Sequence, residues 1–328
     1  MVDYFRSNWI VATFFTTIFL CLLWAPDFAG YNQIRVSFLL PCMGTHFNDT
    51  FINSTLDMLI TIVLAFINGI LLSLLSVRYL SLGKANIMIP FLYLLTIFSF
   101  PQARSFSSSF AAALFVLLGL LSLFSAGKVK RPTTTLFMSS FFVGCACLLH
   151  SSAFIAIAGF VVISILLHLL SGRNFLVFLG GLLFTFGGCL LFRFLLGYDS
   201  GSVIWGIFSG IDNIHFQFLP RTPATLFLTL VLLYLSGKTI IRWLFHSFGN
   251  KSYRYRVLAS LVVFLLICAI PIFLYANIVF SYLPIIALPL SILLAFNFSD
   301  ERVTKQTKVE FAVLIIAVVV NQVAFFLQ

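Results

Sequence analysis

The sequence predicts an all-α protein, a polytopic bundle of about eleven transmembrane helices. Of its 328 residues, 61% are hydrophobic and only 9% are charged, whereas a soluble domain carries roughly 25% charge. A chain this apolar needs lipid as its solvent. In lipid, every backbone polar group must be paired internally, and apolar runs between short polar segments do this as helices.

We expect residues 1–328 to form a single membrane domain, because the segments between the apolar runs are too short to fold separately. The longest lie at residues 26–55 and 197–221, predicted outside, and at 238–256, predicted inside. The expected spans are 8–25, 56–76, 86–101, 107–126, 134–149, 152–170, 175–195, 222–237, 257–274, 277–297 and 309–327.

Basic residues predict the orientation. The chain has 19 Lys and Arg against 9 Asp and Glu, and cytoplasmic loops of membrane proteins are enriched in Lys and Arg. With a cytoplasmic N-terminus, all but four of the basic residues fall on the inner side. This alternation supports both the multi-pass span count and a cytoplasmic N-terminus, and it accounts for the net charge of +10 without nucleic acid.

Two loop segments have the 3.6-residue apolar period of helices that lie in a membrane interface. The first, 202–219, has Ile204, Ile207 and Ile211 on its apolar side and belongs to the outer loop. The second, 238–248, alternates apolar residues with Lys238 and Arg242 and is predicted to lie on the inner leaflet.

The four outer basic residues are all Arg, whose planar guanidinium grips phosphate or carboxylate groups in two-point contacts. Acidic and histidine side chains accompany them on the same side. The predicted outer site for an anionic substrate consists of Asp27, Arg35, Arg104, His150, Arg193, Asp212, His215 and Arg221. Alternatively, the arginines extend to the headgroups from span ends and the carboxylates are solvated loop residues.

Asp27 follows the first span and is the candidate catalytic residue, as a general base toward a hydroxyl group. It fits equally as a helix cap or as a partner of Arg35. His150 stands in a very short outer turn, where it contacts a phosphate or caps a helix. No nucleotide, zinc or serine-nucleophile motif is present, so we predict no metal and no cofactor.

The central apolar segments follow a particular order: a span, a short basic loop, a small-residue span, a short turn, another span, Gly-Arg and a glycine-rich span. The segments are Leu92–Pro101, Ser107–Ala126, Lys128–Pro132, Leu136–His150, Phe154–Leu170 and Arg173–Phe194. This order resembles the core of C-fold glycosyltransferases, which take sugars from polyprenyl-phosphate carriers. More of the chain resembles an uncharacterised family of bacterial inner-membrane proteins.

The first resemblance implies a catalytic acid in the first outer loop, the place of Asp27, and a carrier phosphate bound by basic residues such as Arg104, Arg193 and Arg221. It also implies a second acid between the third and fourth spans. The segment 100–105 reads Phe-Pro-Gln-Ala-Arg-Ser and has none, which departs from the family pattern and counts against metal-assisted donor binding.

Three functions follow from these features. The first is a glycosyltransferase-like protein of envelope glycan assembly, acting at the outer face on a polyprenyl-phosphate-linked sugar. The second is a non-catalytic membrane subunit of an envelope-assembly complex, with a protein partner. The third is a transporter or flippase of a lipid-linked or anionic substrate, which would place ionisable residues inside the spans. Membrane lipid is a partner in all three.

Overall fold

The computed structural model describes residues 54–80, 88–100, 108–129, 131–150, 153–195, 197, 222–247, 253–274, 279–298 and 305–326. These residues form helices and their connections, without strands. The ten helices among them are α3 (Ser54–Tyr79), α4 (Met88–Phe98), α5 (Ser108–Ala126), α6 (Thr133–Leu149), α7 (Phe154–Leu166), α8 (Gly172–Leu195), α10 (Pro223–Ser247), α11 (Tyr253–Leu274), α12 (Val279–Asn297) and α13 (Lys305–Phe326).

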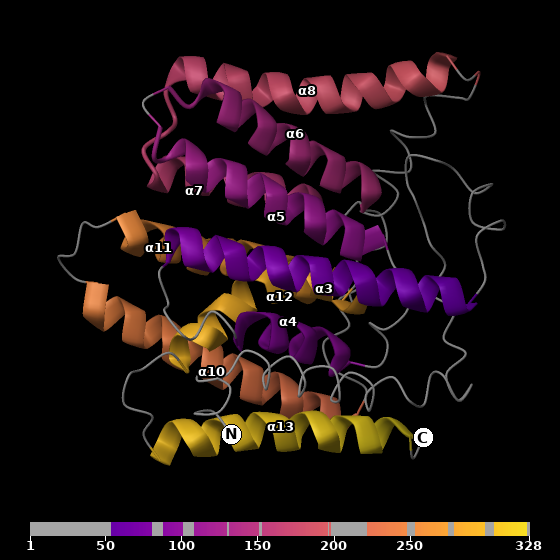
Figure 1. The fold of residues 1–328 in the computed structure, drawn as a ribbon, viewed down its shortest axis with the longest axis vertical. Coiled ribbons are helices and arrows are strands. Elements are labelled where there is room, and N and C mark those ends of the chain that lie inside the picture. Colours follow the sequence, from indigo (N-terminus) through magenta and orange to yellow (C-terminus); the bar gives the residue numbers. More distant parts are fainter. Residues whose placement is uncertain are drawn as a thin grey trace.

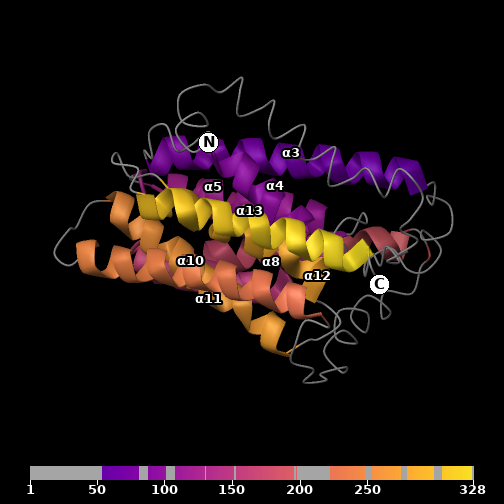
Figure 2. The same cartoon turned by 90° about the horizontal axis from the view of Figure 1, so that it is seen from below.

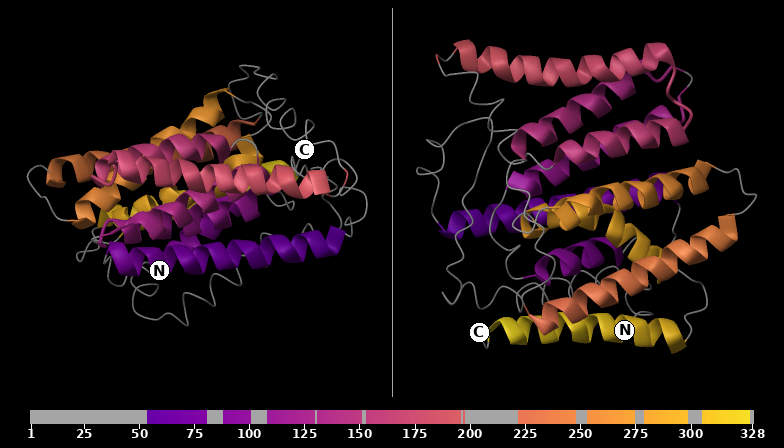
Figure 3. Two further views of the ribbon diagram at one scale, coloured as in Figure 1. Left: turned by 90° about the horizontal axis from the view of Figure 1, so that it is seen from above. Right: turned by 180° about the vertical axis from the view of Figure 1, so that it is seen from behind.

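The helices lie side by side in an elongated bundle, with α8 at one end of its long axis and α13 at the other (Figure 1). The views from below and above place α3 along one side of the bundle and α10 and α11 along the other (Figures 2 and 3). The apolar core runs through the whole array.

The prediction of a helical membrane protein is confirmed. Six of these helices are long and apolar enough to cross a bilayer, namely α3, α5, α8, α10, α11 and α13. Their outward sides remain apolar: Leu183 of α8 and Leu233 of α10 are 70% and 65% exposed. Such surfaces require lipid, so the protein is an integral multi-pass membrane protein.

The helix bounds agree with ten of the predicted spans to within a few residues, except near residue 238. The segment 238–248, expected to be a separate interfacial helix, instead continues α10 as far as Ser247. The apolar residues of this segment continue the helical spacing of the preceding span, and the helix is not interrupted at Gly237. The predicted span 8–25 and the predicted outer helix 202–219 lie outside the described residues.

Two helices, α4 and α12, occupy the centre. Every described side chain of α4 is buried except Pro90, and α12 is buried from Tyr282 to Ala295. Pro284 and Pro289 lie inside α12, and each lacks the N–H group that a helix needs for the carbonyl four residues earlier. Prolines inside a membrane helix are tolerated where neighbouring helices enclose it.

Side-chain amides and a hydroxyl tie these central helices to their neighbours. Gln322 of α13 donates to the carbonyls of Phe98 and Ser99, both at 3.0 Å, and Asn321 donates to Ser99 at 2.8 Å. The hydroxyl of Tyr93 donates to the Pro284 carbonyl at 3.4 Å. These bonds satisfy backbone acceptors that lipid cannot satisfy.

At the opposite end of the helices, a lysine holds three elements together. The ammonium of Lys128 donates to the Arg78 carbonyl at 3.1 Å, and it lies 4.6 Å from the ring centre of Tyr79 and 5.6 Å from that of Tyr253. The Tyr253 hydroxyl donates to the Phe124 carbonyl. We call this end of the bundle, on the left in Figure 1, the basic face.

Small residues let α8 approach α6 closely. A Cβ atom on Gly181 would lie 2.0 Å from the Ser140 hydroxyl and 2.7 Å from the Phe137 carbonyl, whereas a Cβ on the neighbouring Gly180 would meet nothing within 4 Å. The Thr185 side chain fills the corresponding space beside Gly144. Glycine at residue 181 is therefore a packing requirement, while glycine at residue 180 is not.

Gly181→Ala is expected to destabilise the protein by about 1–3 kcal/mol, because the added methyl group overpacks the α6–α8 contact. Gly180→Ala is the matched control and should be neutral or slightly stabilising, since alanine favours helix. Thermal unfolding in detergent measures both. Equal melting temperatures for the two variants would contradict the packing of α8 on α6.

Candidate functional site

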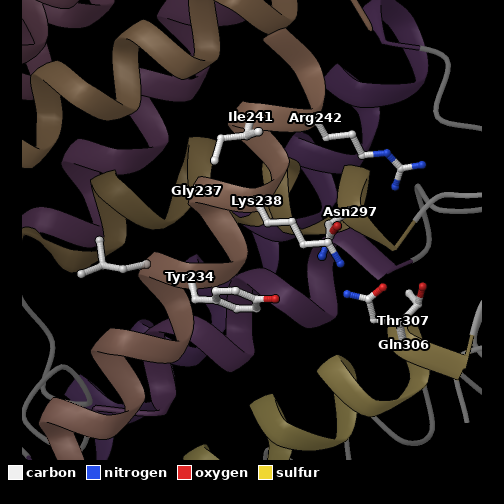
Figure 4. A pocket seen from close by; sticks show the side chains of 9 residues that line it. Tyr234, Gly237, Lys238, Ile241, Arg242, Asn297, Gln306 and Thr307 are labelled. Atoms are coloured by element: carbon white, nitrogen blue, oxygen red, sulfur yellow. The ribbon is translucent and has the colours of Figure 1, made fainter. Parts of the chain in front are cut away.

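A cleft of about 660 Å³ lies at the basic face, between the second half of α10, the end of α12 and the beginning of α13. We call it the α10–α13 cleft. Figure 4 shows polar side chains converging on it from three helices. It is lined by Leu233, Tyr234, Gly237, Lys238, Ile241, Arg242, Asn297, Gln306 and Thr307.

Helix α10 supplies the basic side of the cleft. Tyr234, Lys238 and Arg242 are four residues apart and therefore lie on one face of the helix. In Figure 4 their side chains extend to the same side, toward Asn297 and Gln306. This alignment requires α10 to continue past Gly237, so the cleft depends on the uninterrupted helix.

An ion pair joins α10 to α13 beside the cleft. The ammonium of Lys238 donates to Oε1 of Glu310, and Nδ2 of Asn297 donates to its Oε2 at 3.3 Å. Glu310 is 7% exposed, and the Lys238 side chain is 29% exposed. Both carboxylate oxygens are thereby engaged, and the Lys238 charge is held at a fixed place in the cleft wall.

The first turn of α13 forms the opposite wall. Gln306 and Thr307 line the cleft there, and this turn contains Lys305 and no acidic residue. Helix N-termini have unpaired N–H groups and a partial positive charge, for which acidic residues are the usual complement. The nearest carboxylate among the described residues of α13 is that of Glu310, one turn further along the helix.

The cleft combines these charges with apolar surface at one end of two candidate spans, Pro223–Arg242 and Lys305–Phe325. Leu233 and Ile241 are both more than half exposed. Lipid headgroups meet the ends of spans, where cationic side chains and apolar surface adjoin. The arrangement is suited to a ligand with an anionic group and an apolar tail.

Two residues of the predicted outer site lie in the described part of the chain. His150 follows α6 and is half-buried, with its ring stacked on Tyr282 of α12 at 6.3 Å between centres. Burial lowers its pKa to about 4, so the ring is neutral at pH 7 and does not attract phosphate by charge. Arg193 is buried on α8, which packs mainly on α6.

The other predicted site residues lie outside the described residues. They are Asp27, Arg35, Arg104, Asp212, His215 and Arg221. The convergence of these residues at the outer face therefore stays a prediction. The two predicted site residues that are described lie on different parts of the bundle. His150 contacts the central helix α12, whereas Arg193 lies on α8, the helix at one end of the bundle (Figure 1).

The sequence-based search did not find the α10–α13 cleft. It placed Lys238 and Arg242 on a separate interfacial helix and gave no role to Asn297 or Glu310. Two signals were present. Lys238 and Arg242 repeat at a four-residue interval that continues the preceding helix, and Glu310 is an acid at the start of a long apolar run, where ionisable residues are costly and commonly functional.

Residues 32–327 match the model of a family of unknown function, DUF6427, and the chain belongs to this family. No curated protein and no solved structure matches the chain. The sequence analysis predicted that the chain belongs to an uncharacterised family. This is confirmed, since the matching family has no known function.

Lys238→Met is expected to destabilise the protein by up to about 3 kcal/mol, because it leaves the buried Glu310 carboxylate without its cationic partner. The double variant Lys238→Met/Glu310→Met should recover most of this loss, since it removes both charges. Thermal unfolding of both variants and of Glu310→Met gives the coupling between the two residues. Additive losses in the double variant would show that the pair is not coupled.

Proposed function

We propose that this member of the family handles a lipid-linked anionic substrate and binds its phosphate in the α10–α13 cleft at the cytoplasmic face of the membrane. One observation carries the proposal: Arg242 and Lys238, the latter in its ion pair with Glu310 of α13, line the cleft beside exposed apolar side chains of α10. Arginine and lysine are the usual protein partners of phosphate.

The cytoplasmic assignment is part of the proposal and rests on charge. Arg78, Lys128, Arg131, Arg254 and Arg256 are all exposed at the basic face. Positive residues gather on the cytoplasmic side of membrane proteins, and the inner leaflet is anionic. A ligand with its phosphate at this level would have its tail beside the lipid-facing side of α10.

Of the three roles suggested by the sequence, transport of a lipid-linked substrate has the most support among the described residues. Such a role begins with uptake at the inner leaflet, where the cleft offers a phosphate site. It also favours ionisable residues within the spans, and Glu310 lies inside the candidate span Lys305–Phe325. We therefore propose a flippase-like function.

Glycosyl transfer at the outer face is the second candidate. In that role Asp27 would act as a general base on the acceptor, while arginines neutralise the leaving phosphate of a polyprenyl-phosphate-linked sugar. The buried Arg193 at the end of α8 favours this candidate, since a buried guanidinium near the headgroups suits an anion. A non-catalytic subunit would need neither transport nor glycosyl transfer. A stable protein partner would distinguish this third role from the other two.

Arg242→Gln is expected to weaken binding of an anionic phospholipid about tenfold, because it removes a charge-assisted contact with the phosphate. Arg254→Gln is the matched control: it removes the same charge from the same face, at an exposed residue outside the cleft. Native mass spectrometry of delipidated protein titrated with phosphatidylglycerol measures both. Equal effects of the two substitutions would refute the cleft as the phosphate site.

In liposomes containing a fluorescent polyprenyl-phosphate-linked sugar and a hydroxyl acceptor, we expect the wild-type protein to expose inner-leaflet probe to an external quencher. Arg242→Gln should slow this exposure several-fold, because uptake begins at the cleft, and Asp27→Asn should leave it unchanged. The opposite result, no exposure but sugar transfer that is lost in Asp27→Asn, would favour the glycosyltransferase.

A further inference from the structure

We propose that the α10–α13 cleft couples the binding of a lipid phosphate to the uptake of a proton by Glu310. The coupling rests on the proposed function, since it concerns the same phosphate site and describes how binding there is regulated. Lys238 is not a free cation, because its ammonium is already bonded to the Glu310 carboxylate. A phosphate in the cleft therefore either shares this ammonium with Glu310 or draws it away.

Glu310 has one cation among its contacts with described residues. Lys238 reaches it from α10, and the neutral amide of Asn297 reaches it from α12 at 3.3 Å. The Glu310 residue is 7% exposed, whereas the Lys238 side chain is 29% exposed and also lines the cleft. Lys238 is thus open to a ligand, while the carboxylate behind it depends on Lys238 rather than on water to offset its charge.

The other titratable groups around Glu310 do not take over this part. Those near it in the described chain are Lys305 and Lys308 on α13, both exposed, and Tyr234 and Arg242 on α10. Arg242 already has an interaction of its own. Helices α4 and α12 contact α13 through aromatic side chains, and they contain buried tyrosines but no charged residue. The ionisation of Glu310 is therefore tied to the position of the Lys238 ammonium.

Asn297 can accompany Glu310 in either protonation state. Its Nδ2 group donates to Oε2 of the carboxylate, and an amide N–H donates equally well to the C=O oxygen of a carboxylic acid. The bond from Lys238 to Oε1 is different, because it is charge-assisted and weakens when the acid becomes neutral. Glu310 can therefore take up a proton while Asn297 keeps one of its oxygens paired.

Two anions around one ammonium are costly in a partly buried place. When like charges share a site, one of the acids binds a proton. A phosphodiester is a much stronger acid than a carboxylic acid, so the phosphate stays ionised and Glu310 takes the proton from the water at the basic face. Lys238 then pairs with the phosphate in place of the carboxylate. One negative charge enters with the lipid and one positive charge enters with the proton, so the site stays neutral.

The first test counts protons. Full-length protein in weakly buffered detergent solution is titrated with phosphatidylglycerol, while a pH indicator measures proton uptake and native mass spectrometry counts the bound lipid. Wild-type protein should take up as much as about one proton per lipid bound in the cleft, and Glu310→Gln should take up none. Lipid binding to the wild type without proton uptake would refute the coupling and would show that Lys238 bridges both anions.

The second test is the pH dependence of lipid affinity. Because the bound state holds one proton more than the free state, affinity should fall as pH rises, by as much as about tenfold per pH unit. In Glu310→Gln this slope should be lost. The glutamine oxygen still accepts a hydrogen bond but leaves the Lys238 charge to the phosphate, so the variant should bind phosphatidylglycerol more tightly than the wild type at alkaline pH. A merely structural Glu310 predicts weaker binding by the variant at every pH.

Arg254→Gln is the control for general charge effects, since Arg254 is exposed outside the cleft, and it should keep the wild-type slope. Histidines titrate in the same range, but they are present in every variant, so the difference from Glu310→Gln isolates the acid. If Glu310→Gln fails to fold, the proton count and the slope of the wild type still decide the question.

The outcomes separate the coupling from the proposed function. If Arg242→Gln weakens lipid binding more than Arg254→Gln does, but wild-type binding takes up no proton and is independent of pH, the phosphate site stands and the coupling is refuted. If Arg242→Gln has no more effect than Arg254→Gln, the proposed phosphate site itself fails.

Discussion

The ion pair between Lys238 and Glu310 is the contact on which the geometry of the cleft depends. It joins α10 to α13 and, through Asn297, brings in the end of α12. A charge left alone in this partly buried position would be costly, so the three helix segments are held in one arrangement. The same pairing offsets the charge of Lys238 with that of Glu310.

The cleft is connected to the rest of the bundle through α12, which is buried and contains two prolines. Neutral polar side chains, rather than charges, hold the centre: the Tyr93 hydroxyl bonds to Pro284, and Asn321 and Gln322 bond to the end of α4. Among the described residues, most charged side chains therefore lie toward the basic face, with Arg193 at the other end of α8 as an exception. This separation allows a charged ligand to bind there without disturbing the apolar core.

Much of the fold could be predicted from the sequence, because a transmembrane span has a strong signal: a long apolar run ended by Lys or Arg. The same rule caused the error at Lys238, where a basic residue was taken as the end of a span although α10 continues to Ser247. The site was harder to predict. Glu310 and Lys238 are 72 residues apart, and no local pattern indicates that their helices pack together. The outer site was inferred from loop residues, most of which lie outside the described residues.

The Lys238–Glu310 ion pair is better explained by where it places the Lys238 ammonium than by a gain in the stability of the fold. A buried ion pair adds little net stability, because desolvation of the two ions offsets their attraction, and apolar residues of similar size often pack as well or better. In a bundle with abundant Leu, Ile and Phe, two apolar side chains would serve to join α10 and α13. They would not hold an ammonium group in the cleft wall four residues from Arg242. The energetic cost of Glu310 is therefore accounted for by the placement of Lys238, on which the proposed phosphate site depends.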